Sequence, residues 1–385
     1  MDFSWTDGER AFRAEARDWL TAHVPKQALP SGDAADGFAR HIEWEKKLFD
    51  ARWAVVSWPV EYGGRGASLI QWLIFEEEYY RAGAPNRMTQ NGIFLLAPTL
   101  FEFGTQEQKD RILPKMAAAE QLWAQGWSEP QAGSDLAGIK STAVRAAGGW
   151  RLSGQKTWCT RAVFCDALFG LFRTDPEAGR HGGLTYFMVD LKAPGVTLNG
   201  FDRLDGDQDF AEVFLEDAFV SDCDVIGQVD DGWRVAMATA SSERGLTLRS
   251  PGRFMATAER LVELCRQIGD GIDPSLRDAV ARAWIEADAY RLYTFRTAER
   301  ISAGESLGAE SSLNKLFWSE MDVRTHETAL ALLGASAELE SGPGAVDVGA
   351  WMKGYQFALA GPIYAGTNEV QRNVVARRLL GLPRG

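Results

Sequence analysis

The hydrophobic repeat of this 385-residue chain changes twice, from helical to strand-like and back again. Up to about residue 122, apolar residues recur at helical spacing, as they do over residues 12–20. Short apolar segments separated by Gly and Pro then follow, which is typical of a β-sheet region. The helical period returns and continues to the end. The pattern predicts a mainly α chain with an inserted β domain, divided into residues 1–122, 123–230 and 231–385.

Individual elements can be predicted within these regions. The segment "LIQWLIFEEEYYRAG" (69–83) has a helical apolar pattern that stops at a glycine. The segment "GTQEQKDRILPKM" (104–116) opens with Thr105 and has Gln108 three residues later, which is the pattern of a capping box at a helix start. In the β region, "GWRLSGQKTWCT" (149–160) predicts two strands around its central Ser-Gly pair.

Charge and cysteine content limit the classes of partner. The net charge of −12 argues against nucleic acid or an anionic membrane as a partner, although it does not exclude a local basic pocket. The four cysteines show no metal-ligand spacing and suit free thiols in a reducing cytoplasm. The first residues have neither the basic nor the apolar region of a signal peptide, and no apolar stretch approaches membrane-spanning length. We therefore expect a cytoplasmic protein with no metal site and no membrane span.

A first candidate functional segment is "QGWSEPQAGSDLAGIKS" (125–141), which lies where helices give way to strands. Gly133, Ser134 and Asp135 predict a tight turn with exposed backbone N–H groups. Such groups and neighbouring hydroxyls can hold anionic or carbonyl oxygens. An ordinary surface loop is the alternative that spacing alone leaves open.

A second candidate is "SGQKTWCTRA", in which Trp158 and Thr160 project to the same face of a strand. A flat aromatic ring beside a hydroxyl suits one side of a planar heterocycle, with the hydroxyl donating to a ring atom. A core tryptophan with a neighbouring surface threonine remains the alternative.

A third candidate is the segment 230–250, predicted as a helix with Glu243 near its middle. Its neighbours on the same side of the helix are uncharged and mostly small: Ala236, Thr239, Ala240, Leu246 and Thr247. A carboxylate on such a face lies either at the surface or in a cavity, where desolvation would raise its pKa and make it a usable base. Arg244 projects about 100° away around the helix, so the two residues need not pair.

Together these segments resemble the acyl-CoA dehydrogenase family over essentially the whole chain. The matching motifs stand in family order and at family-like spacing: "WPVEYGG", "FGTQEQKDRILPKM", "SEPQAGSDLAGIKS", "GQKTW", "DDGWRVAM" and "IYAGTNEVQRNVVARRLLGLP". The resemblance implies an N-terminal helical domain, a middle β-barrel or sheet domain and a C-terminal four-helix bundle. It also implies FAD as the cofactor and dehydrogenation of acyl-CoA thioesters at the Cα–Cβ bond.

The resemblance bears directly on the catalytic base. In many family members the loop matching "IYAGT" has a catalytic glutamate where this chain has Ala365, which cannot take a proton. A second subset of the family has its base on the helix matching 231–250, and the matching position here is Glu243. The resemblance therefore implies that Glu243 removes the α-proton while the β-hydrogen leaves as hydride to the flavin.

The other site residues follow from the same residue-by-residue match. Ser128 would contact the flavin ring, Trp158 and Thr160 would flank it, and the Thr160 hydroxyl would lie near the hydride-accepting nitrogen. The implied cofactor-binding residues are Ser128, Gly133, Trp158, Thr160, Thr367 and Glu369. The implied substrate-binding residues are Ser134, Arg244, Tyr364, Ala365 and Gly366.

One departure concerns the family's Arg-x-x-Phe-Gly motif, which grips FAD from a neighbouring subunit. This chain instead reads "CRQIGDGIDPSLR". Similar departures occur in family members that form mixed tetramers, some of which act on steroid-derived acyl-CoAs. The implied partners are an acyl-CoA substrate, an electron-transferring flavoprotein, and identical or different subunits in a dimer or tetramer.

Three functions remain open at this point. The first is an active acyl-CoA dehydrogenase that uses Glu243. The second is a catalytically silent subunit that completes a partner's flavin site, which Ala365 and the missing motif favour. The third keeps the fold but changes the reaction: a flavin oxidase or monooxygenase, or a dehydrogenase for carrier-protein-linked acyl groups.

Overall fold

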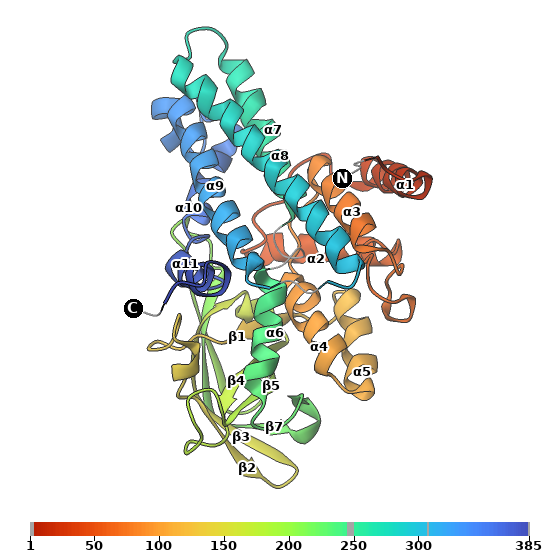
Figure 1. Cartoon of the computed structure of the whole chain (residues 1–385), viewed down its shortest axis with the longest axis vertical. Helices are drawn as coiled ribbons and strands as arrows, with labels where there is room; N and C mark the ends of the chain where they lie inside the picture. The colour runs from red at the N-terminus through yellow and green to blue at the C-terminus, as the bar shows by residue number, and fades with distance from the viewer. Residues whose placement is uncertain (1–3, 245–249, 306–307, 384–385) are drawn as a thin grey trace. The chain divides into compact units, whose positions relative to one another are not determined.

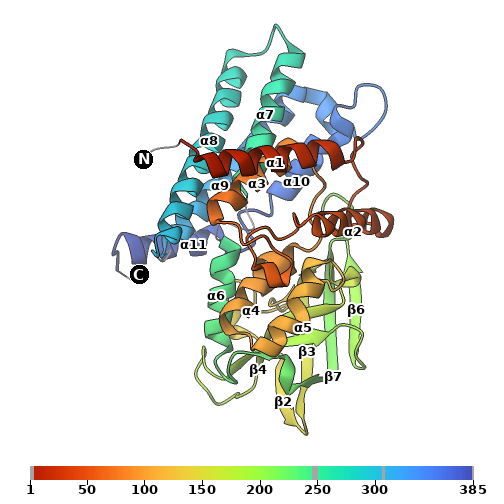
Figure 2. The same ribbon diagram turned by 90° about the vertical axis from the view of Figure 1, so that its right-hand side faces the viewer.

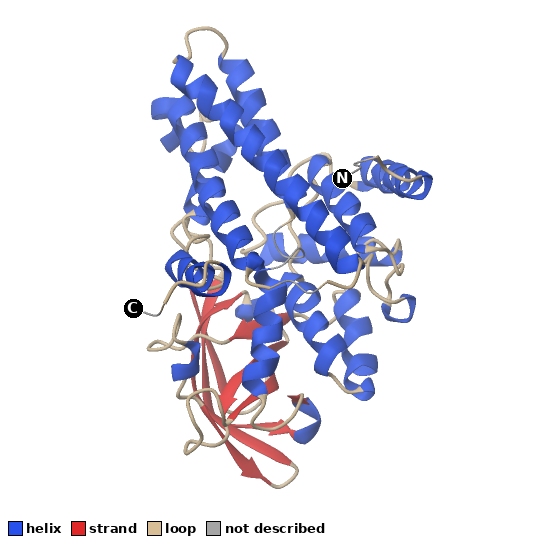
Figure 3. Ribbon diagram, in the orientation of Figure 1, coloured by secondary structure: helices blue, strands red, loops and turns tan. Residues whose placement is uncertain are grey.

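The computed structural model describes residues 4–244, 250–305 and 308–383. Helices form the N-terminal part, strands follow, and helices return after them (Figures 1 and 3). This order confirms the predicted mainly α chain with an inserted β region. No helix within the described ranges combines the length and the hydropathy that crossing a membrane requires.

The elements have the following bounds. In the described residues, the α-helices are α1 (Asp7–His23), α2 (Ala35–Asp50), α3 (Leu69–Arg81), α4 (Ala97–Phe103), α5 (Gln106–Ala117), α6 (Gly232–Arg244), α7 (Pro251–Ile268), α8 (Pro274–Ser302), α9 (Glu310–Leu333), α10 (Ala350–Ala358) and α11 (Asn368–Val374). The strands are β1 (Trp123–Gly126), β2 (Thr142–Ala146), β3 (Gly149–Thr160), β4 (Ala167–Arg173), β5 (Leu184–Asp190), β6 (Val196–Phe201), β7 (Phe210–Ser221) and β8 (Val225–Ile226).

Two compact units make up the chain, and each draws on separate stretches of sequence. The helical unit comprises residues 1–24, 68–84 and 244–385. The sheet unit comprises residues 25–67 and 85–243. The three predicted sequence segments are a different division, and their boundaries stay a prediction.

The sheet unit is built on a mixed sheet that has eight strands in the described residues. The strand order is β6-β7-β3-β2-β4-β5-β8, with β1 paired to β4. The pairs β1–β4 and β2–β4 are parallel and the others are antiparallel. Leu152, Phe172, Phe187 and Val213 belong to its buried core. The helix α6 runs alongside α4 in the same unit (Figure 2).

The strand β3 is one continuous strand, so the prediction of two strands around Ser153 and Gly154 is wrong. Its pairing with β7 shifts register at Gly154 and again before Cys159. The φ angle of Gly154 is 147°, and a Cβ atom at this position would lie 2.2 Å from Oγ of Ser141. The glycine therefore marks a close approach between two backbone segments, not the end of a strand.

The local signals for helix starts are confirmed. The helix α3 begins after Ser68, which forms a capping box with Gln71, and it ends close to the predicted glycine. The helix α5 begins after Thr105. The Thr105 hydroxyl accepts the N–H of Gln108 at 3.2 Å, and the Gln108 side chain accepts the N–H of Thr105 at 3.0 Å. Each box satisfies backbone donors that a helix start would otherwise leave free.

In the helical unit, α7 packs against α3, α8 and α9, while α10 and α11 pack against α9. Phe254, Tyr290 and Trp318 form one buried cluster, and Leu261 and Trp351 belong to another. The C-terminal segment is therefore anchored through α9, which explains how the last residues before the end of the chain are held in place.

Candidate active site

The segment between β1 and β2 is tied down by a buried ion pair. Nζ of Lys156 lies 2.8 Å from Oε1 of Glu129, and both side chains are buried. The Glu129 carboxylate also accepts the N–H groups of Lys140 at 2.6 Å and Ser141 at 3.0 Å. Burial tends to raise the pKa of Glu129, but the Lys156 ammonium and the N–H donors outweigh it and lower the pKa to about 2. The charged carboxylate thus fixes the loop that follows it.

This loop contains the residues for which a tight turn was predicted. Glu129 and Ala132 exchange backbone hydrogen bonds of 2.9 and 3.0 Å, and Gly133 and Ser134 follow as an exposed bend. A Cβ atom built on Gly133 would meet none of the described atoms within 4 Å. The hydrogen-bonded turn therefore spans residues 129–132, and the predicted turn at Gly133 to Asp135 is instead a bend at Gly133 and Ser134. The backbone at Gly133 is open to close approach by a ligand.

Trp158 is an exposed aromatic residue next to that loop. Its side chain is 59% exposed, so the alternative of a core tryptophan is wrong. The ring packs edge-on against Phe201 and Phe210, with centroids 5.2 and 5.4 Å away. The N–H of Thr157 donates to the carbonyl oxygen of Ser128 at 2.9 Å. This bond brings the backbone of Ser128 beside the strand that bears Trp158.

Thr160 lies at the end of β3 and is half-buried. The next residue, Arg161, has a left-handed backbone (φ 54°), as does Trp158 (φ 59°). The Arg161 guanidinium is held by Asp33 at 2.8 Å and Asp209 at 3.4 Å. Non-glycine residues pay roughly 1–2 kcal/mol for this conformation. The surrounding contacts therefore fix Thr160 between two strained residues, which is common at ligand sites.

Glu243 is the penultimate residue of α6, and Arg244 is the last. The prediction placed Glu243 near the middle of a helix over 230–250, but the described part of that helix ends at Arg244. The predicted neighbours Leu246 and Thr247 lie outside the described residues. Thr239, one turn before Glu243, is fully buried and its hydroxyl is hydrogen-bonded. The side of α6 that bears Thr239 thus faces the interior of the sheet unit.

The loop between α10 and α11 has two consecutive left-handed residues, Ala365 (φ 56°) and Gly366 (φ 79°). The side-chain amide of Gln371 donates to the carbonyl oxygens of both, at 3.1 and 3.3 Å. The N–H of Asn368 closes the loop by donating to the carbonyl oxygen of Pro362 at 2.9 Å. The backbone at Ala365 is therefore held in one arrangement even though it has no side-chain acid.

The other predicted residues of this loop surround the start of α11. The Thr367 hydroxyl caps the helix by accepting the N–H of Val370 at 3.3 Å. Glu369 is exposed, and hydrogen bonds from its own N–H and from the Thr367 hydroxyl lower its pKa. The ring of Tyr364 stacks on Trp318 with centroids 5.9 Å apart.

The predicted set divides between the two units. The sheet unit holds Ser128, Gly133, Ser134, Trp158, Thr160 and Glu243, and the helical unit holds Arg244, Tyr364, Ala365, Gly366, Thr367 and Glu369. Within the sheet unit, the bond between Thr157 and Ser128 joins the predicted loop to β3. Within the helical unit, Tyr364 to Glu369 form one continuous loop and helix start. The roles assigned to these residues stay predictions.

Some structural contributors were not predicted. Glu129 and Lys156 stand inside two recognised motifs, and the sequence signal for their pairing is opposite charge alone. Gln371 lies one turn into α11, where the sequence gives no sign that its amide reaches back to the loop. Thr239 was identified only as an uncharged neighbour of Glu243. Its partners come from segments far away in the chain.

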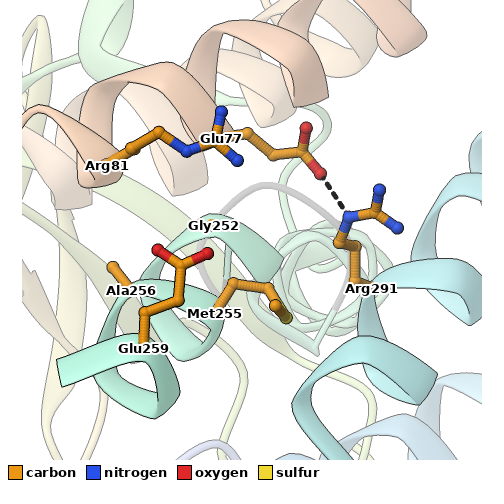
Figure 4. Close-up of a pocket in the computed structure, with 7 residues that line it drawn as sticks. All are labelled: Glu77, Arg81, Gly252, Met255, Ala256, Glu259 and Arg291. Atoms are coloured by element: carbon orange, nitrogen blue, oxygen red, sulfur yellow. Dashed lines mark hydrogen bonds and ion pairs between the residues drawn. The ribbon is translucent and has the colours of Figure 1, made fainter. Parts of the chain in front are cut away.

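The helical unit contains a small cavity that is too small for a cofactor. It measures about 30 Å³ and is lined by residues of α3, α7 and α8, among them Glu77, Gly252 and Arg291. Figure 4 shows Glu77 reaching toward Arg291, with Nε of Arg291 2.7 Å from the carboxylate. A space of this size holds about one or two water molecules.

The turn between α7 and α8 is where the family's Arg-x-x-Phe-Gly motif is missing. Gly269 and Gly271 both have positive φ angles in this turn. Asp273 then caps α8 by accepting the N–H of Ser275 at 2.8 Å. The segment thus forms a plain helical hairpin.

Comparison with known proteins identifies the family. Domain models of the acyl-CoA dehydrogenase family match residues 6–120 (N-terminal domain), 124–218 (middle domain) and 230–380 (C-terminal domain). Acyl-CoA dehydrogenase IpdE1 of Mycolicibacterium smegmatis is 38% identical over 391 residues, which cover 97% of each chain. IpdE1 of Mycobacterium tuberculosis is also 38% identical and covers 97% of each chain.

Solved structures agree with this result. The Tcur3481-Tcur3483 steroid ACAD superposes with a TM-score of 0.87 at 28% identity, over 100% of both chains. The ChsE4-ChsE5 complex from Mycobacterium tuberculosis superposes with a TM-score of 0.86 at 28% identity, also over 100% of both chains. The predicted fold of N-terminal helices, middle sheet and C-terminal helices is confirmed, and the chain belongs to the acyl-CoA dehydrogenase family of oxidoreductases, which act on CH–CH donors.

Proposed function

We propose that this enzyme catalyses the FAD-dependent α,β-dehydrogenation of an acyl-CoA thioester with Glu243 as its base. One observation supports the assignment above others: the position where many family members have their glutamate is Ala365, in a loop whose backbone is nevertheless held by hydrogen bonds from Gln371 and Asn368. The conformation of the loop is thus held even though alanine replaces the glutamate. Glu243 supplies a carboxylate at the end of α6, at the position where a second subset of the family has its base.

The sheet unit has side chains that suit a flavin ring. Trp158 offers an exposed aromatic edge or face that Phe201 and Phe210 hold in place. Ser128 and Thr160 offer hydroxyl groups, and Gly133 offers open backbone. Members of this family typically bind FAD, which accepts a hydride when bound. We infer that these residues hold the ring and that Thr367 and Glu369 contribute from the helical unit.

The role of Glu243 is proton abstraction. The thioester carbonyl acidifies the α-hydrogen, and backbone N–H groups at the site stabilise the negative charge that develops on the carbonyl oxygen. Glu243 takes the α-proton as the β-hydrogen leaves. Ser134, Arg244, Tyr364, Ala365 and Gly366 are the residues that we assign to binding the substrate.

The substrate class and partners are part of the same proposal. Similarity to the Tcur3481-Tcur3483 steroid ACAD supports a ring-bearing acyl-CoA, for which the small Ala365 side chain leaves room. Similarity to the ChsE4-ChsE5 complex supports assembly with a second, different chain. We propose an electron-transferring flavoprotein as the electron acceptor. Reduction of artificial acceptors but not of such a flavoprotein would contradict this part.

The test of the base is Glu243→Gln. This change keeps the shape of the side chain and removes the base, so bound flavin should remain while its reduction by substrate falls by about 10²–10⁴-fold. The probes are butyryl-CoA, octanoyl-CoA and cyclohexylpropanoyl-CoA, and the measurement is the loss of oxidised-flavin absorbance in a single turnover. A variant that is reduced as fast as the parent shows that Glu243 is not the base.

The second variant adds Ala365→Glu to that background. Alanine already adopts the left-handed backbone at this position, so glutamate adds no new backbone strain. We expect partial recovery with butyryl-CoA and none with cyclohexylpropanoyl-CoA, because the added side chain takes up space near the acyl group. Ala365→Gln in the same background is the control, and it should recover nothing.

A catalytically silent subunit is the second candidate, since Ala365 and the plain turn between α7 and α8 favour it. A chain that stays colourless with FAD, both alone and with a partner subunit, supports that candidate. Rapid oxidation of the reduced flavin by oxygen would instead favour an oxidase.

A further inference from the structure

The buried hydroxyl of Thr239 joins three elements of the sheet unit. It lies 2.7 Å from the hydroxyl of Thr99 in α4 and 3.4 Å from the hydroxyl of Tyr186 in β5. It also lies 3.1 Å from the carbonyl oxygen of Val235, one turn earlier in α6. All three hydroxyl-bearing side chains are buried. We call Thr99, Tyr186 and Thr239 the hydroxyl cluster.

The hydroxyl cluster continues toward the segment between β1 and β2. We call this segment the predicted flavin loop, because it bears Ser128 and Gly133. The indole N–H of Trp127 donates to the Tyr186 hydroxyl at 3.1 Å. Trp127 directly precedes Ser128, whose carbonyl oxygen is bonded to β3. A single tyrosine in β5 therefore contacts both the helix that bears Glu243 and the loop that bears Ser128.

The start of α6 is fixed to the same strand. The Thr185 hydroxyl accepts the N–H of Asp230 at 2.8 Å. A Cβ atom on Gly232 would lie 2.7 Å from the carbonyl oxygen of Leu184, so the first turn of α6 presses against the backbone of β5. Since the helix is held at its start and again at Thr239, neither its position along β5 nor its rotation about its own axis is free.

The rotation of α6 about its axis sets the side of the helix on which residue 243 lies. Thr239 and Glu243 are four residues apart and so share one side of the helix. The side around Thr239 is otherwise apolar, with Val235, Ala236 and Ala240 buried. Apolar contacts alone tolerate small rotations, whereas the hydrogen bond between the buried hydroxyl groups of Thr239 and Thr99 is directional and is lost when the helix turns. The hydroxyl cluster thus selects one rotation.

We propose that Thr239 and Tyr186 are positioning residues for catalysis: their hydroxyl groups fix the rotation of α6 and so set the side of the helix on which residue 243 lies. This inference rests on the proposed role of Glu243. It adds residues that touch neither the reacting carbon nor the cofactor, and it predicts a loss of rate without a loss of binding.

The plain alternative is a threonine that only bonds to its own helix. This chain has examples in α8 and α9, where Thr294 bonds to the carbonyl oxygen of Tyr290 and Thr325 to that of Met321, both at 2.8 Å. Thr239 differs from these because its hydroxyl also reaches two other elements. Thr294 is fully buried as well, so Thr294→Val is a matched control for removing a buried hydroxyl.

The experiment compares Thr239→Val, Thr239→Ser, Tyr186→Phe and Thr294→Val in the full chain with its FAD and any partner subunit. Valine keeps the volume of threonine and removes the hydroxyl, whereas serine keeps the hydroxyl. Three quantities are measured: FAD content, the substrate concentration that half-saturates flavin reduction, and the single-turnover rate. The probe is whichever of butyryl-CoA, octanoyl-CoA and cyclohexylpropanoyl-CoA reduces the parent fastest.

A further readout isolates the proton step. An acyl-CoA analogue with sulfur in place of the β-carbon has no β-hydrogen to transfer, so exchange of its α-hydrogen in deuterium oxide reports the base alone. Mass spectrometry of the recovered analogue gives the exchange rate. Poor placement of a catalytic group by about 1 Å can cost on the order of 10²-fold in rate.

We expect Thr239→Val and Tyr186→Phe to lower both the single-turnover rate and the exchange rate by about 10- to 10²-fold, with FAD content and half-saturation unchanged. Thr239→Ser should restore both rates, and Thr294→Val should leave them at the parental value. Parental exchange in Thr239→Val overturns the inference. So does a loss of FAD that matches the loss of rate, because the cluster would then be merely structural.

Failure of the inference is distinguishable from failure of the proposed function. If Glu243→Gln abolishes exchange and Thr239→Val does not, Glu243 remains the base and the positioning role is wrong. If Glu243→Gln keeps parental exchange, the base assignment fails and the inference fails with it.

Discussion

At the scale of single residues, the ion pair between Lys156 and Glu129 determines how the predicted flavin loop is held. Both side chains are buried. A carboxylate buried without its cation is costly, since breaking a buried pair from one side typically destabilises a protein by about 3–5 kcal/mol. Lys156→Met should therefore lower the free energy of unfolding of the chain far more than a surface substitution would.

The same pair predicts how stability depends on pH. The pKa of Glu129 lies at about 2 in the folded chain, below its ordinary value of 4.5. The stabilisation is thus present above pH 4.5 and is lost as the pH falls toward 2. Urea unfolding across that window should show a smaller loss of stability in Glu129→Gln than in the parent. Equal slopes in the two proteins would mean that Glu129 is not responsible.

At the scale of elements, β3 shows where a strand depends on its neighbours. The pairing of β3 with β7 shifts register at Gly154, and the Cα atom of Gly154 lies close to Ser141. A methyl group added at Gly154 would have to displace the backbone of Ser141. Gly154→Ala should cost about 1–3 kcal/mol through overpacking and an unfavourable φ angle. The measurement is the midpoint of urea unfolding, with Gly133→Ala as the control, because a Cβ atom at Gly133 meets open space.

Elements set by local sequence were predictable, and elements set by pairing were not. The capping box at Thr105 needs only residues within one turn, so sequence spacing was enough to place the start of α5. The continuity of β3 depends on its partner β7, about 60 residues later in the chain. Without knowledge of β7, Gly154 was interpreted as the end of one strand and the start of another.

In the candidate site, too, the sequence predicted local features but not those that depend on distant contacts. The motifs identified Trp158 and Ala365, but their left-handed backbones come from the contacts around them and not from their own preferences. The small, uncharged side of α6 was visible in the sequence. The hydrogen bonds that hold α6 in place were not visible in the sequence, because only the fold of the sheet unit brings Thr99 and Tyr186 to Thr239.

At the scale of the whole molecule, the helical unit exposes large apolar side chains. Two of its helices expose large apolar side chains, among them Trp284 and Ile285 in α8 and Leu313 and Phe317 in α9. Ile285 is 61% exposed and Leu313 44% exposed. We propose that these exposed apolar residues are covered by another subunit.

The missing Arg-x-x-Phe-Gly motif suggests which kind of chain that is. If the motif normally grips the FAD of a neighbouring subunit, a complex of identical copies of this chain would lack that grip at every site. A different family member that has the motif would restore it. We therefore predict that the chain expressed alone binds little FAD, and that co-expression with such a member yields a stable mixed complex containing FAD. Light scattering gives the mass, and absorbance gives the flavin per chain. A tetramer of this chain alone with one FAD per chain would show that no second chain is required.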